Sequence, residues 1–503
     1  MALIAEAPRV APRRDLVPPL ALAAGVFAVH VALSGRFGFH RDELYDLAAG
    51  RHPAAGYVDR PPLVPLLARG VTAVAGEHLW PLRVVAAAIH AGVVAVTVLV
   101  AAAFGGRARA LVLAALAAAL APSFLTAGSL FVAGSFELLW WSLAILAVVR
   151  LMAGADPRWW LAVGGLVGLG LETRWTAAVA AAALVAGLAA TAESRRLLRS
   201  PWPWAGLAVA LALWSPHLAW QAFDGWPGTD AVREAGAAVR AEQGWRGFAG
   251  RQVALAGPVG VGFAVAGLVW LGRRRRWRAL AVTGVLTVAG LAVLGADGYS
   301  TAPVYVAGFA AGAVAVDRWI RHDAHRLHNI VAGLAGLGLV AAPGVVPVTS
   351  PHAYGQLYHD LFPELGEEVG WTEAVDLVAT VRDVLPARER PGLRVVTATA
   401  GEAAAIDLYG PARGLPRGTA LSADGGYADW WPDGEPAGTV IFVRYSRRAI
   451  EPYCHTMGPV VVVGNAARVP NEAAGATVSL CRELRVSPEE LRDALRDVAP
   501  QEM

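Results

Sequence analysis

The first two thirds of the chain alternate between long apolar runs and short segments that carry arginine. Most runs approach the roughly 20 residues that an α-helix needs to cross a bilayer. We therefore predict about eleven membrane-spanning helices; the fifth run is short, so the count can differ by one or two. The predicted spans are residues 16–34, 81–104, 110–127, 130–151, 159–171, 175–192, 203–220, 251–272, 279–295, 302–319 and 329–347.

Arginines fall in alternate loops between these runs. The positive-inside rule assigns such loops to the cytoplasmic side. The N-terminus is then inside, and the loop 36–80 and the C-terminal part are outside. The first run lacks a convincing small-residue cleavage site, which favours an uncleaved signal anchor. The clustered arginines are Arg13 and Arg14, Arg107 and Arg109, Arg150 and Arg158, Arg195, Arg196 and Arg199, Arg273 to Arg276 with Arg278, and Arg318, Arg321 and Arg326.

The chain changes character near Pro343. Residues 1–348 are predicted to form the membrane domain and residues 349–503 a soluble, extracytoplasmic α/β domain. Its apolar pattern predicts a helix over 366–385 and short buried strands over 393–399, 439–445 and 460–464.

Both cysteines of the chain, Cys454 and Cys481, lie in the C-terminal domain. Two cysteines in an exported domain favour one disulfide. Two buried free thiols are the alternative that the sequence leaves open.

Composition agrees with a membrane protein. The chain has 503 residues, of which 56% are hydrophobic and 17% charged, against about 25% charged in a soluble domain. All 43 basic residues are arginine, as codon bias in a GC-rich, actinobacterial-type genome would produce. A net charge of +3 gives no reason to expect nucleic acid as a partner. Nucleotide-binding and zinc motifs are absent from the sequence, including GxGxxG, Walker A, HExxH and CxxC.

The predicted external loop 36–80 carries an adjacent acidic pair, Asp42 and Glu43. Charged groups beside a bilayer are costly unless water reaches them or a site uses them. Simple capping of a short helix that runs through Tyr45 is an equally good explanation, because acids are favourable at a helix N-terminus.

Glu137 argues for a functional interpretation, because it lies within an otherwise apolar span. A structural ion pair with Arg174 is its alternative. The predicted topology places both of them, the acidic loop and the segment Asp297–Tyr299 on the outer side of the membrane.

The loop HRDELYDLAAGRHPAAGYVDRPPLVPLLAR resembles the first external loop of the GT-C glycosyltransferases of the protein-O-mannosyltransferase and aminoarabinose-transferase type (family 39 type). The resemblance continues through FELLWWSLAILAVVRL, GLGLETRWTA, DGYSTAPVYVAGFAAGAVAV and GEAAAIDLYGPARGLP, and so covers nearly the whole chain. It implies a GT-C fold and a bacterial membrane enzyme.

The sequence departs from this resemblance at several positions. Arg60 stands where relatives often have histidine, and Arg174 where they often have lysine. Asp297 replaces a frequent lysine, which puts a phosphate-binding role of that loop in doubt. An expected asparagine-rich motif is replaced by the residues SADGGY at 422–427.

The resemblance implies transfer of a sugar from a polyprenyl-phosphate carrier to an acceptor outside the cytoplasmic membrane, which we expect to be an envelope glycan, lipid or protein. A single-step displacement would invert the anomeric carbon. Transfer needs a base for the acceptor hydroxyl and positive groups for the departing phosphate. We predict Asp42 as the base, Glu43 as a residue that orients the acceptor or holds a cation, and Glu137 as a second acid. Arg174 would bind the phosphate.

Weaker substrate-binding candidates are Arg60, Asp59, Tyr45 and Tyr299. Metal dependence stays open: Asp42 and Glu43 could hold Mg²⁺ or Mn²⁺ through carboxylate oxygens, but enzymes of this superfamily also work without a metal.

Two other functions fit many spans and an embedded acid. A transporter or lipid flippase would show related halves and paired broken helices near midplane, and the sequence shows neither. A membrane scaffold that binds envelope polymer would not need Glu137 within a span.

Overall fold

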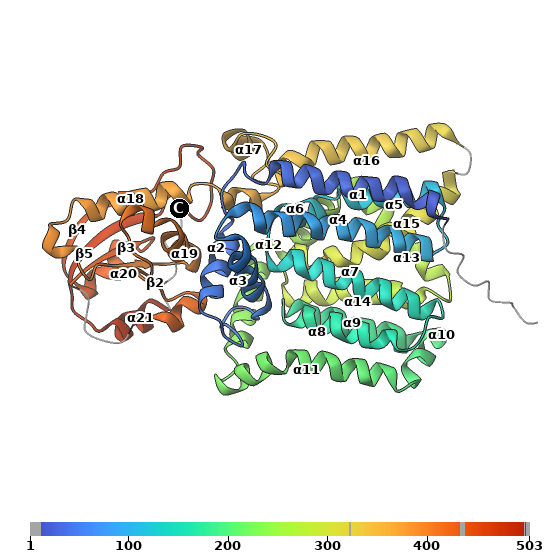
Figure 1. The fold of residues 1–503 in the computed structure, drawn as a ribbon, viewed down its shortest axis with the longest axis horizontal. Helices are drawn as coiled ribbons and strands as arrows, with labels where there is room; N and C mark the ends of the chain where they lie inside the picture. The colour runs from blue at the N-terminus through green and yellow to red at the C-terminus, as the bar shows by residue number, and fades with distance from the viewer. Residues whose placement is uncertain (1–11, 321–322, 433–437, 497, 499–503) are drawn as a thin grey trace, which may run out of the picture. The chain divides into compact units, whose positions relative to one another are not determined.

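The chain forms two compact units in the computed structural model, which describes residues 12–320, 323–432, 438–496 and 498 (Figure 1). Unit 1 contains the residues up to Ser34, Arg60–Val64 and Trp80–Val346, and unit 2 contains Gly35–Asp59, Pro65–Leu79 and the residues from Pro347. The sequence assigned the loop 36–80 to the membrane domain, whereas most of this loop groups with the C-terminal residues in unit 2. Arg321 lies outside the described residues.

Unit 1 is helical, and each of the eleven predicted spans falls on helix. Its long helices are α1 (Arg13–Leu33), α4 (Leu79–Ala103), α5 (Ala108–Leu120), α6 (Pro122–Ser129), α7 (Ala133–Met152), α8 (Trp159–Leu171), α9 (Thr176–Ala190), α11 (Trp202–Phe223), α12 (Pro227–Ala256), α13 (Pro258–Arg273), α14 (Arg278–Leu294), α15 (Ala302–Ile320) and α16 (Ala324–Val345). The short segments α10 (Ala192–Arg195), η1 (Arg196–Arg199) and η2 (Gly298–Thr301) connect some of them.

Five of the described helices are each long and apolar enough to cross a bilayer, and the number rises to eight when each bent pair counts as one span. The helices α8 and α14 are apolar but shorter. The chain is therefore a multi-pass membrane protein, in which some predicted spans are built from broken helices.

The break between α5 and α6 bends the chain by 61° and has a proline as its cause. Pro122 has no N–H to donate to the carbonyl of Ala118, four residues earlier. His90 of α4, which is fully buried, hydrogen-bonds this carbonyl through Nε2 at 3.1 Å. A side chain thus satisfies the backbone acceptor that the proline leaves in an apolar environment.

Glycines allow the closest helix contacts in unit 1. A Cβ on Gly267 of α13 would lie 2.1 Å from the carbonyl oxygen of Gly308 on α15, and one on Gly312 of α15 would lie 2.1 Å from that of Phe263. The pair α8 and α11 uses Gly164 in the same way. Small residues let membrane helices pack backbone to backbone, so these positions fix the helix pairs.

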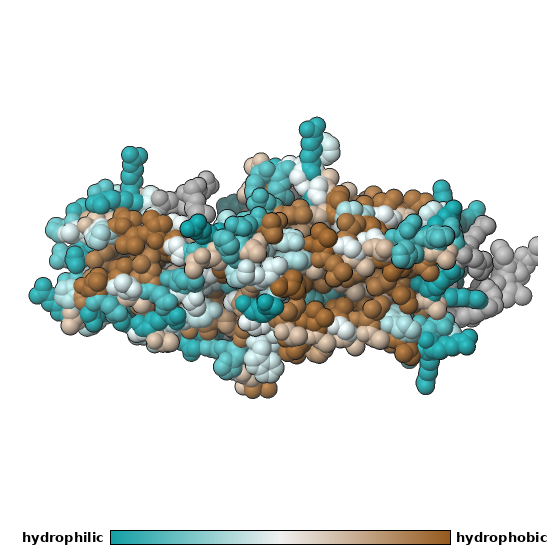
Figure 2. Space-filling view, turned by 90° about the horizontal axis from the view of Figure 1, so that it is seen from above, coloured by the Kyte–Doolittle hydropathy of each residue, from teal (hydrophilic) through white to brown (hydrophobic). Residues whose placement is uncertain are grey.

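The arginine-bearing loops meet at one end of unit 1. Arg276 donates to the carbonyl of Met152 at the end of α7 at 3.0 Å, and Arg109 pairs with Asp317 near the end of α15 at 3.0 Å. Figure 2 shows hydrophilic side chains gathered at this end, beside a hydrophobic band over the helices. The predicted alternation of basic loops therefore corresponds to a common end of the helical unit.

Unit 2 contains a five-stranded sheet in the order β2-β1-β3-β5-β4. The strands are β1 (Arg394–Thr397), β2 (Ala420–Ser422), β3 (Thr439–Val443), β4 (Cys454–Val462) and β5 (Thr477–Leu484). The first three are mutually parallel, and β5 runs antiparallel to β3 and β4. This mixed sheet and its helices confirm the predicted α/β class.

The remaining elements are helices and short turns, of which α2 and α3 lie in the predicted loop 36–80. They are α2 (Arg41–Arg51), α3 (Leu63–Ala75), α17 (Pro351–Leu357), η3 (Pro363–Glu368), α18 (Trp371–Asp383), η4 (Ala387–Glu389), α19 (Ala400–Tyr409), η5 (Pro411–Arg413), η6 (Gly425–Trp430), α20 (Arg447–Ile450), η7 (Glu451–Tyr453) and α21 (Pro488–Arg496).

Two details of the predicted domain are wrong. The helix expected over 366–385 begins only at Trp371, because Gly370 adopts a φ of +92° and ends the preceding turn. The run 460–464 was expected to be a buried strand, yet Val462 in β4 is 60% exposed. An edge strand has a neighbour on one side only, and sequence pattern does not reveal which strand takes the edge.

Cys454 and Cys481 form a disulfide between the neighbouring strands β4 and β5, with a Cα–Cα separation of 5.6 Å. The bridge joins the edge strand to the interior of the sheet.

Candidate functional site

The predicted acidic pair lies in the first turn of α2, in unit 2. Glu43 is fully buried, and its carboxylate accepts a hydrogen bond from the His40 backbone N–H at 2.9 Å. The His40 imidazole Nδ1 in turn accepts from the Asp42 N–H at 3.1 Å. This reciprocal arrangement is a capping box, with histidine in place of the usual serine or threonine, and it gives Glu43 a structural role.

Asp42 is the accessible member of the pair, with a side chain that is 40% exposed. Its carboxylate lies 4.0 Å from Arg41 Nε and 4.0 Å from His40 Nδ1. Arg41 also pairs with Glu472 at 3.3 Å. Burial disfavours the charged imidazole, but the carboxylates of Glu364 and Asp42 outweigh it and raise the pKa of His40. Asp42 therefore combines access to solvent with basic neighbours.

Tyr45 and Asp59 hold α2 against the segment around Gly425. The buried Tyr45 hydroxyl donates to Asp59 at 2.8 Å and accepts from the Gly426 N–H. A Cβ on either glycine would lie 2.8 Å from this hydroxyl. The two glycines that replace the expected asparagine-rich motif are thus the residues that permit this contact.

Unit 1 contains a second group of the predicted site residues, at the start of α7 and in two loops. Arg174 lies between Glu137, at 3.7 Å, and Asp297, at 2.7 Å. Glu137 is only 2% exposed and accepts a further hydrogen bond from Thr176. The structure thus brings Glu137 and Arg174 together, and it adds Asp297 and Thr176, to which the sequence assigned no role.

Asp297 caps the short turn η2. Its carboxylate accepts from the Ser300 N–H at 2.9 Å and from the Ser300 hydroxyl at 2.7 Å. Burial disfavours the charge, but Arg174 and these hydrogen bonds outweigh it and lower the pKa of Asp297. Arg174 is consequently flanked by two carboxylates, which compete with any phosphate for its guanidinium group.

Arg251 of α12 lies beside the predicted residue Tyr299 and was not among the sequence-predicted candidates. Its guanidinium carbon lies 5.8 Å from the ring centre of the predicted residue Tyr299, and its Nε is buried without a hydrogen-bond partner. No carboxylate of the described residues pairs with it. In the sequence Arg251 stands at the first position of the predicted span 251–272, and no role was assigned to it.

The loop before Arg174 carries a second perturbed acid, Glu172. The residue is 9% exposed, and its Oε1 is buried without a hydrogen-bond partner. Burial raises the pKa of Glu172 to about 7. Its backbone carbonyl accepts from the Leu63 N–H at 3.1 Å, which ties this loop to the short segment that carries the partly exposed Arg60.

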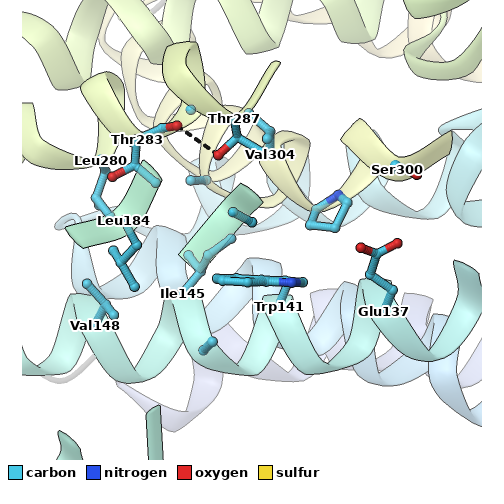
Figure 3. A pocket seen from close by; sticks show the side chains of 15 residues that line it. Glu137, Trp141, Ile145, Val148, Leu184, Leu280, Thr283, Thr287, Ser300 and Val304 are labelled. Carbon is cyan, nitrogen blue, oxygen red and sulfur yellow. Dashed lines mark hydrogen bonds between the residues drawn. The ribbon is translucent and has the colours of Figure 1, made fainter. Parts of the chain in front are cut away.

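An apolar pocket extends from Glu137 between α7, α9, α14 and α15 (Figure 3). Figure 3 shows the Glu137 carboxylate pointing toward Ser300 at one end, with Trp141 along the wall and Val148 and Leu184 farther in. The pocket therefore combines the Glu137 carboxylate at one end with a mostly apolar lining.

Among the described residues, no group of three or more His, Cys, Asp or Glu side chains is arranged to hold a metal ion. The proposed use of Asp42 and Glu43 as metal ligands stays a prediction, and the capping role of Glu43 competes with it.

Comparison with known proteins places the fold. Residues 59–220 match the family model described as dolichyl-phosphate-mannose-protein mannosyltransferase. The structure of ArnT from Cupriavidus metallidurans in the apo state is similar, with a TM-score of 0.57 and 15% identity over 92% of this chain and 97% of that one. The chain therefore has the fold of this ArnT structure. The same ArnT bound to undecaprenyl phosphate gives a TM-score of 0.56 and 15% identity, over 93% and 98% of the two chains.

No curated protein sequence matches this chain. The matched range 59–220 includes Asp59, Arg60, Glu137 and Arg174 but ends before Arg251 and begins after Asp42. The assignment of Asp42 therefore depends on the loop resemblance and on the local geometry of α2.

Proposed function

We propose that the chain transfers a sugar from a polyprenyl-phosphate carrier to a hydroxyl group of an envelope glycan, lipid or protein. The acceptor oxygen attacks the anomeric carbon, and the bond from that carbon to the carrier phosphate breaks. The proton of the acceptor passes to a carboxylate, and polyprenyl phosphate leaves with the bonding electrons. A single displacement inverts the anomeric configuration.

Asp42 is the proposed general base. The observation that carries this assignment is the contrast within the pair: the Glu43 carboxylate is fully buried in a capping box, whereas the Asp42 side chain is 40% exposed. A base must reach the proton that it removes, and Asp42 meets this requirement without breaking the helix cap.

Arg251 is the proposed phosphate-binding residue, together with Arg174. Arg251 has no carboxylate partner among the described residues and keeps a buried, unpaired Nε. A guanidinium group can engage two phosphate oxygens at once. Because Asp297 and Glu137 flank Arg174, Arg174 would mainly orient Glu137 and would bind phosphate only in exchange for a carboxylate.

The carrier is proposed by analogy with ArnT, whose structure was determined with undecaprenyl phosphate. The apolar pocket beside Glu137 supports this proposal, because an isoprenoid chain needs an apolar lining. The proposed orientation has the arginine-rich end of unit 1 in the cytoplasm and the acceptor reaction outside, as the positive-inside rule predicts.

Mass spectrometry of envelope glycans and lipid-linked sugars tests the proposal. A deletion strain is complemented with wild type, with Asp42→Asn or with the matched neighbour variant Asp46→Asn. The expected result is loss of one glycosyl unit and accumulation of its polyprenyl-linked donor in the deletion and Asp42→Asn strains.

Membrane levels of each variant are measured by immunoblot, so that loss of protein is not mistaken for loss of transfer. Normal glycans in the deletion strain would refute the transferase proposal. A deletion phenotype that Asp42→Asn fully complements would refute the base assignment alone. Donor that accumulates only on the cytoplasmic leaflet would instead indicate a flippase.

A further inference from the structure

A groove lies between α13 and α15 at the arginine-rich end of unit 1 and shares no residue with the candidate functional site. The two helices touch through Gly267, Gly308 and Gly312, and beyond this contact an open space separates them. Its apolar lining consists of Ala266, Val269, Trp270, Ala315, Val316 and Trp319. Val269 is 44% and Trp319 59% exposed, so the groove faces outward, where a membrane helix contacts lipid tails.

Two arginines close the end of this groove. Arg273 and Arg274 line it, and the Arg274 guanidinium carbon lies 4.4 Å from the ring centre of Trp270. Arg318 approaches the same ring at 5.6 Å. Two positive charges thus flank one indole ring, and Arg273 lines the same groove.

These charges lack acidic partners within the described part of the chain. The two nearby carboxylates are engaged elsewhere: Asp317 pairs with Arg109 at 3.0 Å and Asp323 with Arg326 at 2.9 Å. Burial and the charge of Arg318 lower the pKa of Arg274, as expected where guanidinium groups repel one another without a counter-ion.

Trp270 adds an unsatisfied donor to this group. The residue is 9% exposed, and its indole Nε1 is buried without a hydrogen-bond partner. Buried donors usually find an acceptor. The groove therefore combines an apolar trough, three unpaired cations and a free N–H, which together match one end of an anionic lipid.

We propose that this groove binds an anionic phospholipid. The lipid phosphate would accept from Arg273, Arg274 and Arg318 and from the Trp270 indole, while one acyl chain would lie along Ala266, Val269 and Val316. Basic pockets between membrane helices are known to suit anionic head groups. A soluble phosphate would satisfy the cations but would leave the trough uncovered.

Native mass spectrometry of the purified full chain in mixed detergent and lipid tests the proposal. The probes are phosphatidylglycerol, phosphatidylcholine and inorganic phosphate. Wild type should retain phosphatidylglycerol in preference to phosphatidylcholine and should melt at a higher temperature in its presence. The double variant Arg274→Gln/Arg318→Gln should retain about ten-fold less, since each guanidinium contributes a charge-assisted hydrogen bond.

The matched control is Arg195→Gln/Arg199→Gln, which removes two arginines of the same end but outside the groove. If the control variant loses as much bound phosphatidylglycerol, general surface charge explains the effect and the proposal is overturned. Unchanged retention in Arg274→Gln/Arg318→Gln would do the same, and so would stabilisation by inorganic phosphate equal to that by phosphatidylglycerol.

A second variant, Val316→Trp, fills the trough and keeps all three arginines. It should also lose phosphatidylglycerol, and it keeps the test decisive if the double arginine variant does not fold. Wild-type retention by a folded Val316→Trp protein would show that the trough holds no acyl chain and would overturn the proposal.

Discussion

The two acidic regions of this protein differ in sequence context and in the contacts that their carboxylates make. In unit 2, one member of the Asp42-Glu43 pair has a local structural role, because Glu43 completes the capping box of α2. Glu137 in unit 1 satisfies no helix end; it meets Arg174 and Thr176 beside an apolar pocket. Glu43 therefore has a structural explanation in its helix cap, whereas Glu137 forms the ion pair with Arg174 that the sequence left open, beside an apolar pocket.

The sharpest test of this comparison is Asp42→Asn. Loss of a general base lowers the transfer rate about 10²- to 10⁴-fold, while the cap that Glu43 and His40 form stays intact. Transfer is measured as the ratio of glycosylated product to lipid-linked donor, and folding as the melting temperature. A fall in melting temperature that accounts for the lost activity would mean that Asp42 is structural.

The substitution Arg251→Gln tests which arginine of unit 1 binds the carrier phosphate. Loss of a charge-assisted hydrogen bond of about 1.5–3 kcal/mol should reduce kcat/KM by roughly 10- to 100-fold. Arg246→Gln, which alters an exposed arginine of the same helix, should change little. If Arg174→Gln lowers activity while Arg251→Gln does not, the original prediction for Arg174 holds and the revised one fails.

The substitution Glu172→Gln tests whether burial of the charged Glu172 carboxylate lowers the stability of the protein. The folded-state pKa of Glu172 is raised to about 7, so ionisation costs stability as pH rises from the unfolded value of about 4.3 through 7. The cost levels off above pH 7 at about 1–3 kcal/mol. The melting temperature of wild type should decline more steeply over this range than that of Glu172→Gln, and parallel curves would contradict the assignment.

Glu43→Gln should have the smallest effect. A glutamine oxygen still accepts from the His40 N–H, and glutamine is a regular capping-box residue. We expect activity within a few-fold of wild type and a loss of stability below about 1 kcal/mol. Inactivation comparable to that of Asp42→Asn, with folding preserved, would assign chemistry to Glu43 and remove the contrast between the two acids.

The sequence predicted the helices well because a span is a local, repetitive pattern of apolar residues. It also singled out Glu137, since one charge in such a run is conspicuous. It assigned no role to Arg251, the first residue of the predicted span 251–272, because only the tertiary fold shows that this arginine meets Tyr299. The exposure of Val462 was equally hidden, since the place of a strand within its sheet depends on residues far away in the chain.

The disulfide between β4 and β5 also has a consequence for biosynthesis. Both cysteines follow the last apolar helix of unit 1 in the chain, so the bridge closes only after the membrane helices have been synthesised. Disulfides form in oxidising compartments and stay reduced in the cytosol. The redox state of Cys454 and Cys481 in cells, which peptide mapping with and without reductant reveals, therefore reports on which side of the membrane unit 2 matures.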